Sequence, residues 1–183
     1  MDKILLKNIY TRKLNLILIV FVGTLLLTLS AKIKVPFIPV PMTMQTFIVL
    51  FLGYYLGPKL ALATVALYIF EGILGFPVFT GTPEKGIGIS YIVGPTGGYI
   101  LGFIISSFLA GTQNYNRNFF SNLFKLLLSV LPIYILGLLW LGNIIGWDKP
   151  VLEFGLYPFI YAEIFKLILL SVIISKFNFR LFR

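Results

Sequence analysis

The sequence predicts an all-α integral membrane protein, a bundle of six transmembrane helices with ordered loops on its outward side. First, 58% of the 183 residues are hydrophobic and only 11% are charged, with a mean hydropathy of +0.98, so a soluble domain could not bury this much apolar surface. Second, six apolar segments reach or approach the roughly 20 residues needed to cross about 30 Å of hydrocarbon. Third, basic residues gather near both ends of the chain. We expect residues 1–183 to form one membrane domain.

The apolar segments cover residues 14–31, 44–57, 59–75, 94–111, 121–145 and 157–175. The second and third are short, and only Gly57-Pro58-Lys59 separates them. Proline interrupts the helix there and the lysine can extend to the interface, so we expect a close antiparallel hairpin. The fourth segment carries Gly98 and Gly102, whose spacing favours close approach of a neighbouring helix.

Two connections are unusual for loops. Residues 34–43 read KVPFIPVPMT, in which the prolines force an extended, non-helical segment that is too apolar for an ordinary solvent loop. Residues 75–98 are rich in glycine and are expected to be non-helical as well. Because irregular backbone near a membrane is tolerated where it lines a cavity, both segments are expected to close over an outward-facing pocket.

The charge distribution predicts the topology. Six spans place both termini on one side, and that side then holds ten basic residues against four on the other, with Lys166 within the membrane. Positive charge accumulates on cytoplasmic loops, so we expect a multi-pass protein of the cell membrane with residues 1–13 and the C-terminus in the cytoplasm. The net charge of +9 is therefore a topology signal, and we expect no nucleic-acid partner.

Composition also excludes several kinds of chemistry. The chain has no cysteine and no histidine, so disulfides, thiolate or imidazole metal sites and histidine-based catalysis are excluded. The glycine-rich segment at 94–98 lacks the GxxxxGK[ST] pattern of an ATPase. The acids form no recognisable catalytic pair. We expect no catalytic residues, no metal and no cofactor.

Glu163 and Lys166 are the strongest candidates for function. They lie three positions apart in the last apolar segment and so share one helix face. Charges at membrane depth cost a few kcal/mol each on insertion scales and usually mark a substrate or ion path. Lys166 could offer its ammonium to an anionic group while Glu163 accepts hydrogen bonds from ligand N–H groups. The alternative is an ion pair that neutralises itself inside the bundle.

Three stretches carry a family resemblance that covers nearly all of the chain from Val35 onward. They are PFIPVPMTMQTFIVLFLGYYLGPKLALATVALYIFEGILGFPVFTG, GPTGGYILGF and PFIYAEIFK, and they closely resemble the BioY family, the biotin-binding S components of energy-coupling factor (ECF) transporters. The resemblance implies six transmembrane helices, a biotin pocket near the outer face and a gating loop between the first two helices. Biotin would be the transported ligand.

The resemblance also assigns roles to residues. The family's last-helix acid and lysine fall at Glu163 and Lys166, with Glu in place of the usual Asp. The implied substrate-binding residues are Glu163, Lys166, Tyr99, Phe79 and Gln45. The implied gate residues are Pro36, Ile38, Pro39 and Pro41.

The implied partners are a transmembrane coupling subunit and two ATPase subunits, in addition to the lipid bilayer. S components often present alanines at AxxxA spacing on the first helix to the coupling subunit. The nearest equivalents here are Gly23, Thr24, Thr28 and Ala31. The alternatives are a solitary carrier of biotin or a related vitamin that works without an ATPase module and, from another class, an intramembrane enzyme.

Overall fold

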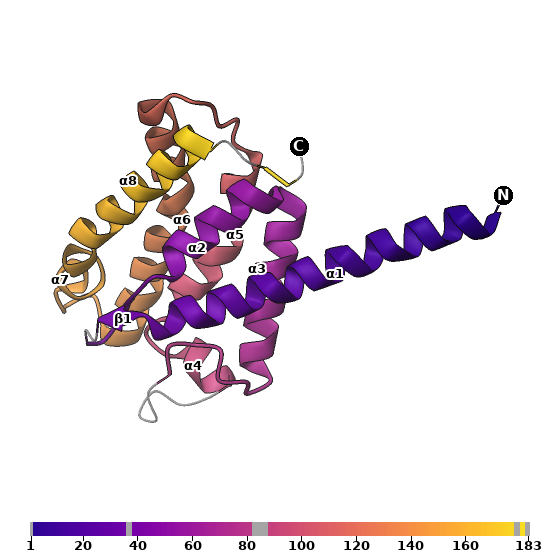
Figure 1. Ribbon diagram of the computed structural model, residues 1–183. Helices are drawn as coiled ribbons and strands as arrows, with labels where there is room; N and C mark the ends of the chain where they lie inside the picture. The colour runs from indigo at the N-terminus through magenta and orange to yellow at the C-terminus, as the bar shows by residue number, and fades with distance from the viewer. Residues whose placement is uncertain (1, 36–37, 82–87, 178–179, 182–183) are drawn as a thin grey trace.

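The computed structural model describes residues 2–35, 38–81, 88–177 and 180–181. Most of this part of the chain is helical and forms one bundle (Figure 1). α5 (Gly97–Thr112) lies at its centre and packs against α2 (Gln45–Leu56), α3 (Pro58–Ile73) and α6 (Phe119–Ile145). The predicted helical class is confirmed.

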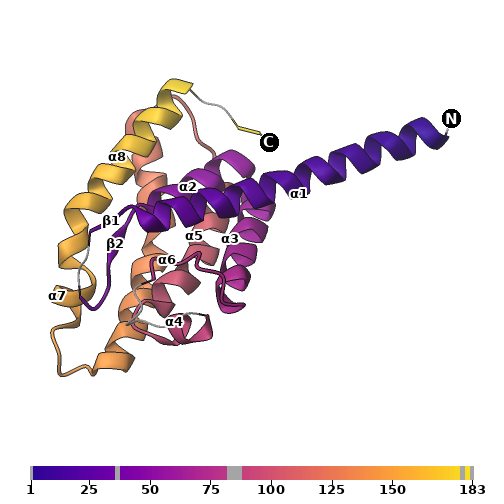
Figure 2. The ribbon, with the colours of Figure 1, turned by 60° about the horizontal axis from the view of Figure 1, so that its bottom comes forward.

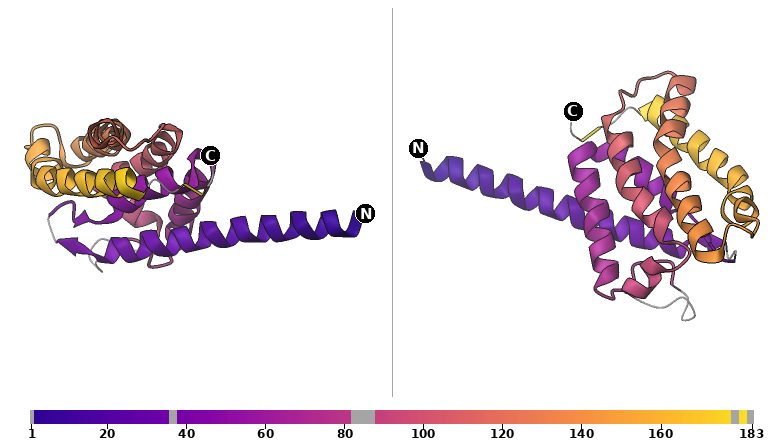
Figure 3. Two further views of the ribbon diagram at one scale, coloured as in Figure 1. Left: turned by 45° about the horizontal axis from the view of Figure 1, so that its top comes forward. Right: turned by 180° about the vertical axis from the view of Figure 1, so that it is seen from behind.

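α1 (Asp2–Lys32) begins earlier than the sequence indicated. The first apolar segment was expected from residue 14, yet the helix continues back to Asp2. Its first half extends away from the bundle, as both views of Figure 3 show. The second half packs on α3, where a Cβ on Gly23 would lie 2.4 Å from Cγ2 of Thr64. The helices therefore touch at a position that only glycine allows.

α2 and α3 form the expected helical pair. Gly57 connects them with a φ of 77°, in the left-handed region that favours glycine, and Pro58 occupies the first turn of α3. The two helices pack against each other. Gly57, which ends α2, and Pro58, which favours the start of a helix, are therefore adjacent at this turn.

The proline-rich connection is extended, as predicted, and it also forms a short hairpin. β1 (Lys34–Val35) pairs antiparallel with β2 (Met42–Thr43), with Lys34 opposite Thr43 and Val35 opposite Met42. Figure 2 shows this hairpin between the end of α1 and α8. It leads directly into α2.

The glycine-rich connection differs from its prediction, because it contains α4 (Ile89–Val93), a single helical turn. Two glycines enclose this turn, since Gly88 has a φ of 74° before it and Gly94 ends it. The indole N–H of Trp140 then donates to the Gly94 carbonyl at 3.0 Å. A side chain from α6 thus fixes the approach to α5.

α5 and α6 approach closely at the two glycines expected to permit it. A Cβ on Gly98 would lie 2.3 Å from the Leu136 carbonyl oxygen, and one on Gly102 would lie 2.5 Å from the Ile133 Cα. After α6 the chain turns through α7 (Val151–Gly155) and the 3₁₀ helix η2 (Tyr157–Phe159) into α8 (Ile160–Phe177). The last predicted span is therefore a 3₁₀ turn followed by an α-helix.

Within the described residues, three helical stretches are long and apolar enough to cross a membrane: Leu14–Lys32, Phe119–Ile145 and Val151–Phe177. Gln45–Leu56 and Gly97–Thr112 are apolar but shorter. These features define a multi-pass membrane protein. The count of six spans stays a prediction.

Candidate functional site

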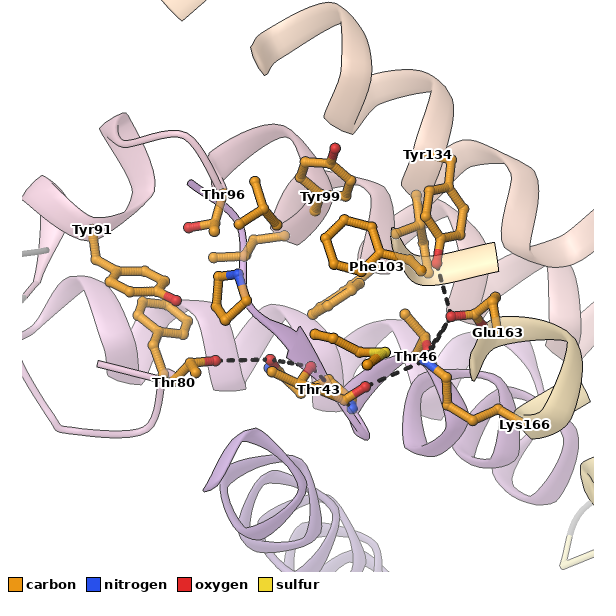
Figure 4. A pocket seen from close by; sticks show the side chains of 18 residues that line it. Thr43, Thr46, Thr80, Tyr91, Thr96, Tyr99, Phe103, Tyr134, Glu163 and Lys166 are labelled. Atoms are coloured by element: carbon orange, nitrogen blue, oxygen red, sulfur yellow. Dashed lines mark hydrogen bonds and ion pairs between the residues drawn. The ribbon is translucent and has the colours of Figure 1, made fainter. Parts of the chain in front are cut away.

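A cavity lies among α2, α5, α6 and α8, under the β1–β2 hairpin and the loop that follows α3 (Figure 4). Its walls are mainly apolar and aromatic, with polar groups gathered in two places. The lining residues are Val40, Pro41, Met42, Thr43, Gln45, Thr46, Phe79, Thr80, Tyr91, Thr96, Tyr99, Ile100, Phe103, Ile133, Tyr134, Phe159, Glu163 and Lys166.

Glu163 and Lys166 form one polar end of this pocket. Both are buried, at 5% and 6% exposure, and the Lys166 Nζ lies 2.6 Å from Oε2 of Glu163. They belong to the first two turns of α8, so one helix presents both side chains to the cavity. Glu163 and Lys166 therefore form an ion pair with each other, which was one interpretation of the sequence. Both also line a cavity, which the other interpretation, a ligand-binding pair, requires.

Neighbouring side chains concentrate on one oxygen of Glu163. The hydroxyls of Thr46 and Tyr134 donate to Oε2 at 2.9 and 2.8 Å. Lys166 also donates to Thr46 Oγ1 and to the Thr43 carbonyl. Oε2 thus accepts from two hydroxyls and the ammonium.

The other oxygen of Glu163 remains available. Oε1 is buried and has no hydrogen-bond partner among the described residues. A buried carboxylate oxygen without a donor is unfavourable by about 1–3 kcal/mol or more. Since Glu163 lines the cavity, a hydrogen-bond donor that enters the cavity is the kind of group that would satisfy it.

Gln45 forms a second polar group, which lies toward the loop side of the pocket. Its carbonyl oxygen accepts from the hydroxyls of Thr43 and Thr80 at 3.1 and 3.3 Å. Its amide donates to the Tyr68 hydroxyl at 2.8 Å, and that hydroxyl donates to the Val78 carbonyl at 3.0 Å. Because a primary amide has two N–H donors, one more can serve a ligand acceptor.

Aromatic rings form the wall between these polar groups. Phe79 stacks on Tyr91 with ring centroids 5.0 Å apart and meets Tyr68 edge-on at 5.4 Å. On the other side Tyr99 meets Tyr134 edge-on at 6.3 Å. The Tyr99 hydroxyl donates to the Gly155 carbonyl at 2.8 Å. Tyr99 therefore offers its ring to the cavity while its hydroxyl holds α7 in place.

The structure brings all five predicted substrate-binding residues to this one cavity. Sequence reasoning missed Thr43, Thr46 and Tyr134, which organise the charged pair. Tyr134 comes two residues after Pro132, inside the long apolar run of α6, and Thr46 lies in the first turn of α2. A lone hydroxyl in an apolar helix carries no periodic signal, so only the packing reveals these contacts.

The predicted gate residues have different positions. Pro41 lines the cavity, together with Val40 and Met42 from the same segment. Ile38 is 88% exposed and Pro39 is half-buried, and neither lines the cavity. Pro36 lies outside the described residues. The part of this segment that covers the pocket is therefore residues 40–43.

The predicted docking stripe on α1 is not at the surface. Gly23 packs on Thr64 of α3, and Thr24 and Ala31 are 2% and 0% exposed. Thr28 is half-buried and donates to the Thr24 carbonyl at 2.9 Å. Small residues allow close packing within one chain as readily as between chains, so these contacts account for the stripe within the bundle, and docking of a partner on it stays a prediction.

Fold and site together define a class: a multi-pass membrane protein with a buried pocket for one small molecule that carries polar groups. The chain belongs to the BioY family, whose sequence pattern matches residues 3–183. It is 40% identical over 141 residues to the "Probable biotin transporter BioY" of Pyrococcus horikoshii, covering 77% of this chain and 82% of the relative. It is 34% identical over 151 residues to the "Biotin transporter BioY" of Thermotoga maritima, covering 82% and 88%.

A solved structure has the same fold. It is described as the S-component for biotin from an ECF-type ABC transporter, and it matches with a TM-score of 0.74 at 26% sequence identity. The match covers 92% of this chain and 93% of that chain. The likeness therefore extends over nearly the whole length of both chains.

Proposed function

We propose that this protein binds biotin in the pocket and mediates its uptake as the S component of an ECF-type ABC transporter. Family membership, the names of its relatives and the solved S-component support this function. The observation in the structure that carries it is the buried, unpartnered Oε1 of Glu163 beside Lys166. A transporter subunit of this kind is not an enzyme, and biotin is its cargo.

The pair matches one end of biotin. The ureido group offers N–H donors and a carbonyl acceptor, which suit the free Glu163 oxygen and the Lys166 ammonium. The valerate carboxylate is at the opposite end of biotin, so a pair only 2.6 Å apart cannot hold both ends. We therefore place the carboxylate toward Gln45 and Thr80, with the ring system between the aromatic walls. This proposal differs from the interpretation of the sequence alone, in which Lys166 meets the anionic group of the ligand.

We further propose six membrane crossings with the pocket near the outer face. At 1.5 Å per residue, the 12 residues of α2 rise about 18 Å, too little to cross about 30 Å of hydrocarbon. The cavity and the extended segment above it occupy the missing depth, where irregular backbone is tolerated because it lines a pocket. Residues 40–43 would form the gate. A coupling subunit and two ATPase subunits would complete the transporter in the bilayer.

Titration of labelled biotin into the purified protein tests this function directly. We expect saturable binding by the wild type and at least about tenfold weaker binding by Glu163→Gln and by Lys166→Met, since each removes a hydrogen-bonding group that the ligand needs. Lys149→Met is the matched control, because that lysine is exposed and pairs only with an exposed Asp148 at 3.4 Å among the described residues.

Removing one member of a buried ion pair can also destabilise the bundle by about 3–5 kcal/mol. The double variant Glu163→Gln/Lys166→Met removes both charges and avoids that penalty. Size-exclusion profiles report whether each variant is folded. Wild-type affinity in a folded double variant would rule out the pair as the ureido site, and no saturable binding by the wild type would overturn the function itself.

A further inference from the structure

The loop after α3 covers the pocket, and other parts of the chain hold it in place. Phe79 and Thr80 line the cavity with their side chains. The carbonyls of Pro77, Phe79 and Thr80 accept hydrogen bonds from two lysines that do not line it. Lys32 Nζ donates to Pro77 O at 2.7 Å and to Phe79 O at 2.6 Å, and Lys34 Nζ donates to Thr80 O at 3.1 Å.

The remaining carbonyl of this loop, that of Val78, also accepts a hydrogen bond from a side chain. Val78 O accepts from the buried hydroxyl of Tyr68 at 3.0 Å. All four consecutive carbonyls from Pro77 to Thr80 therefore accept from side chains of other elements. A segment held in this way depends on its donors, because no helix or strand of its own fixes its backbone.

The two lysines come from the segment that leads into the gate. Lys32 is the last residue of α1, and Lys34 begins β1, whose partner β2 lines the cavity through Met42 and Thr43. The lysines therefore connect the two segments that cover the pocket. Hydrogen bonds from an ammonium to a carbonyl are stronger than those between neutral groups.

We propose that Lys32 and Lys34 are positioning residues that latch the Pro77–Thr80 loop to the hairpin and thereby slow the escape of bound biotin. This inference rests on the proposed function. Breaking the latch frees the Phe79 ring and the Thr80 hydroxyl from the cavity wall. The ligand then leaves faster, while the Glu163–Lys166 end of the site remains intact.

The positive charges could instead act at a distance by attracting the biotin carboxylate, which we place at this end of the pocket. The two mechanisms can be distinguished by comparing a charged with an uncharged ligand, and by measuring the association and dissociation rates separately. A latch retains biotin and its uncharged carboxamide equally and changes mainly the dissociation rate. Long-range attraction favours the anion alone and changes mainly the association rate, with a strong dependence on salt.

The experiment measures association and dissociation of labelled biotin and biotin carboxamide with purified wild type, Lys32→Met, Lys32→Arg and Lys32→Met/Lys34→Met. Methionine keeps the apolar stem and removes the donors, while arginine keeps donors and charge. We expect dissociation of both ligands from the double methionine variant to be about tenfold faster, with little change in association and wild-type behaviour for Lys32→Arg. Lys149→Met serves as the control for loss of an outer lysine.

Two results would overturn the latch: dissociation rates of the methionine variants equal to wild type, or a change confined to charged biotin. Absence of biotin binding by the wild type would instead contradict the proposed function, so the two failures are distinguishable. Both lysines are exposed, and we expect the variants to fold. If the double variant does not, the single Lys32→Met variant, which removes two of the three lysine hydrogen bonds, gives the same test.

Discussion

At the scale of residues, one hydroxyl organises the charged end of the pocket. Thr46 donates to Oε2 of Glu163 and accepts from Lys166, so its hydroxyl contacts both members of the ion pair. Together with Tyr134, it directs the donors of the protein to one carboxylate oxygen. The other oxygen, Oε1, is left without a donor among the described residues. Glu163 and the two residues that orient it come from three different helices, α8, α2 and α6.

Replacing Thr46 with valine tests this orienting role. Valine keeps the shape and removes the bridge, so Glu163 is free to turn and Lys166 loses one acceptor. We expect biotin affinity to fall by about five- to thirtyfold, the equivalent of about 1–2 kcal/mol for a hydrogen bond to a charged group. Thr112→Val is a suitable control, since that hydroxyl bonds to Leu109 O at the far end of α5. Equal affinities for the two variants and the wild type would show that Thr46 does not orient the acid.

At the scale of helices, glycines let α5 serve as the common contact of the bundle. Gly98 and Gly102 face the α6 backbone, and Gly111 lies where a Cβ would be 2.4 Å from the backbone nitrogen of Pro58. From the other side, a Cβ on Gly53 of α2 would lie 2.5 Å from the Ser107 carbonyl oxygen. Without a hydrophobic force between helices in lipid, such close packing is a main source of association. It also fixes Tyr99 and Phe103 at the pocket.

Gly102→Ala measures the value of this packing. Alanine is the better helix former by about 0.8–1.0 kcal/mol, so an isolated helix would be stabilised. Here its Cβ would meet the Ile133 backbone, which cannot move aside without shifting α6. We expect a net destabilisation of about 1–3 kcal/mol, typical of overpacking, seen as a lower melting temperature in detergent. Ile105→Ala, at a 45% exposed position of the same helix, should melt like the wild type. An unchanged or raised melting temperature for Gly102→Ala would show that the two helices are free to separate.

Local sequence patterns predicted many of the structural elements, but few of the side-chain contacts between those elements. The proline-rich segment, the turn at Gly57 and the pair Glu163–Lys166 were predictable, since each depends on residues close in sequence. Contacts such as Thr46 with Glu163 join residues 117 positions apart, and no periodicity encodes them. The stripe on α1 shows the limit of a local pattern, because its small residues fit an internal contact and a docking face equally well.

At the scale of the whole molecule, the two ends of the bundle differ in construction. One end holds the hairpin, α4 and α7, and the other holds the α5–α6 connection and the C-terminus (Figure 1). The pocket lies at the first end, where the hairpin and α4 contribute lining residues such as Met42 and Tyr91. At the second end Arg180 donates to Tyr54 O at 3.0 Å and to Gly111 O at 2.7 Å, which ties the chain end to α2 and α5. The amide of Leu181 also donates to Tyr55 O at 2.9 Å. The end of the chain thus closes one side of the bundle while loops cover the other.

This asymmetry leads to a prediction about orientation. The positive-inside rule assigns ten basic residues to the side of the C-terminus and four to the side of the pocket. Single cysteines can be added to this cysteine-free chain and labelled with a membrane-impermeant reagent in intact cells. We expect labelling of Ile38→Cys, at an 88% exposed position, and of Asp148→Cys, whose side chain is 74% exposed. We expect none for Asn118→Cys or Lys176→Cys until the cells are permeabilised. Labelling of Asn118→Cys and Lys176→Cys, but not of Ile38→Cys and Asp148→Cys, in intact cells would show that the protein has the opposite orientation. The pocket would then face the cytoplasm, where it could not collect biotin for uptake.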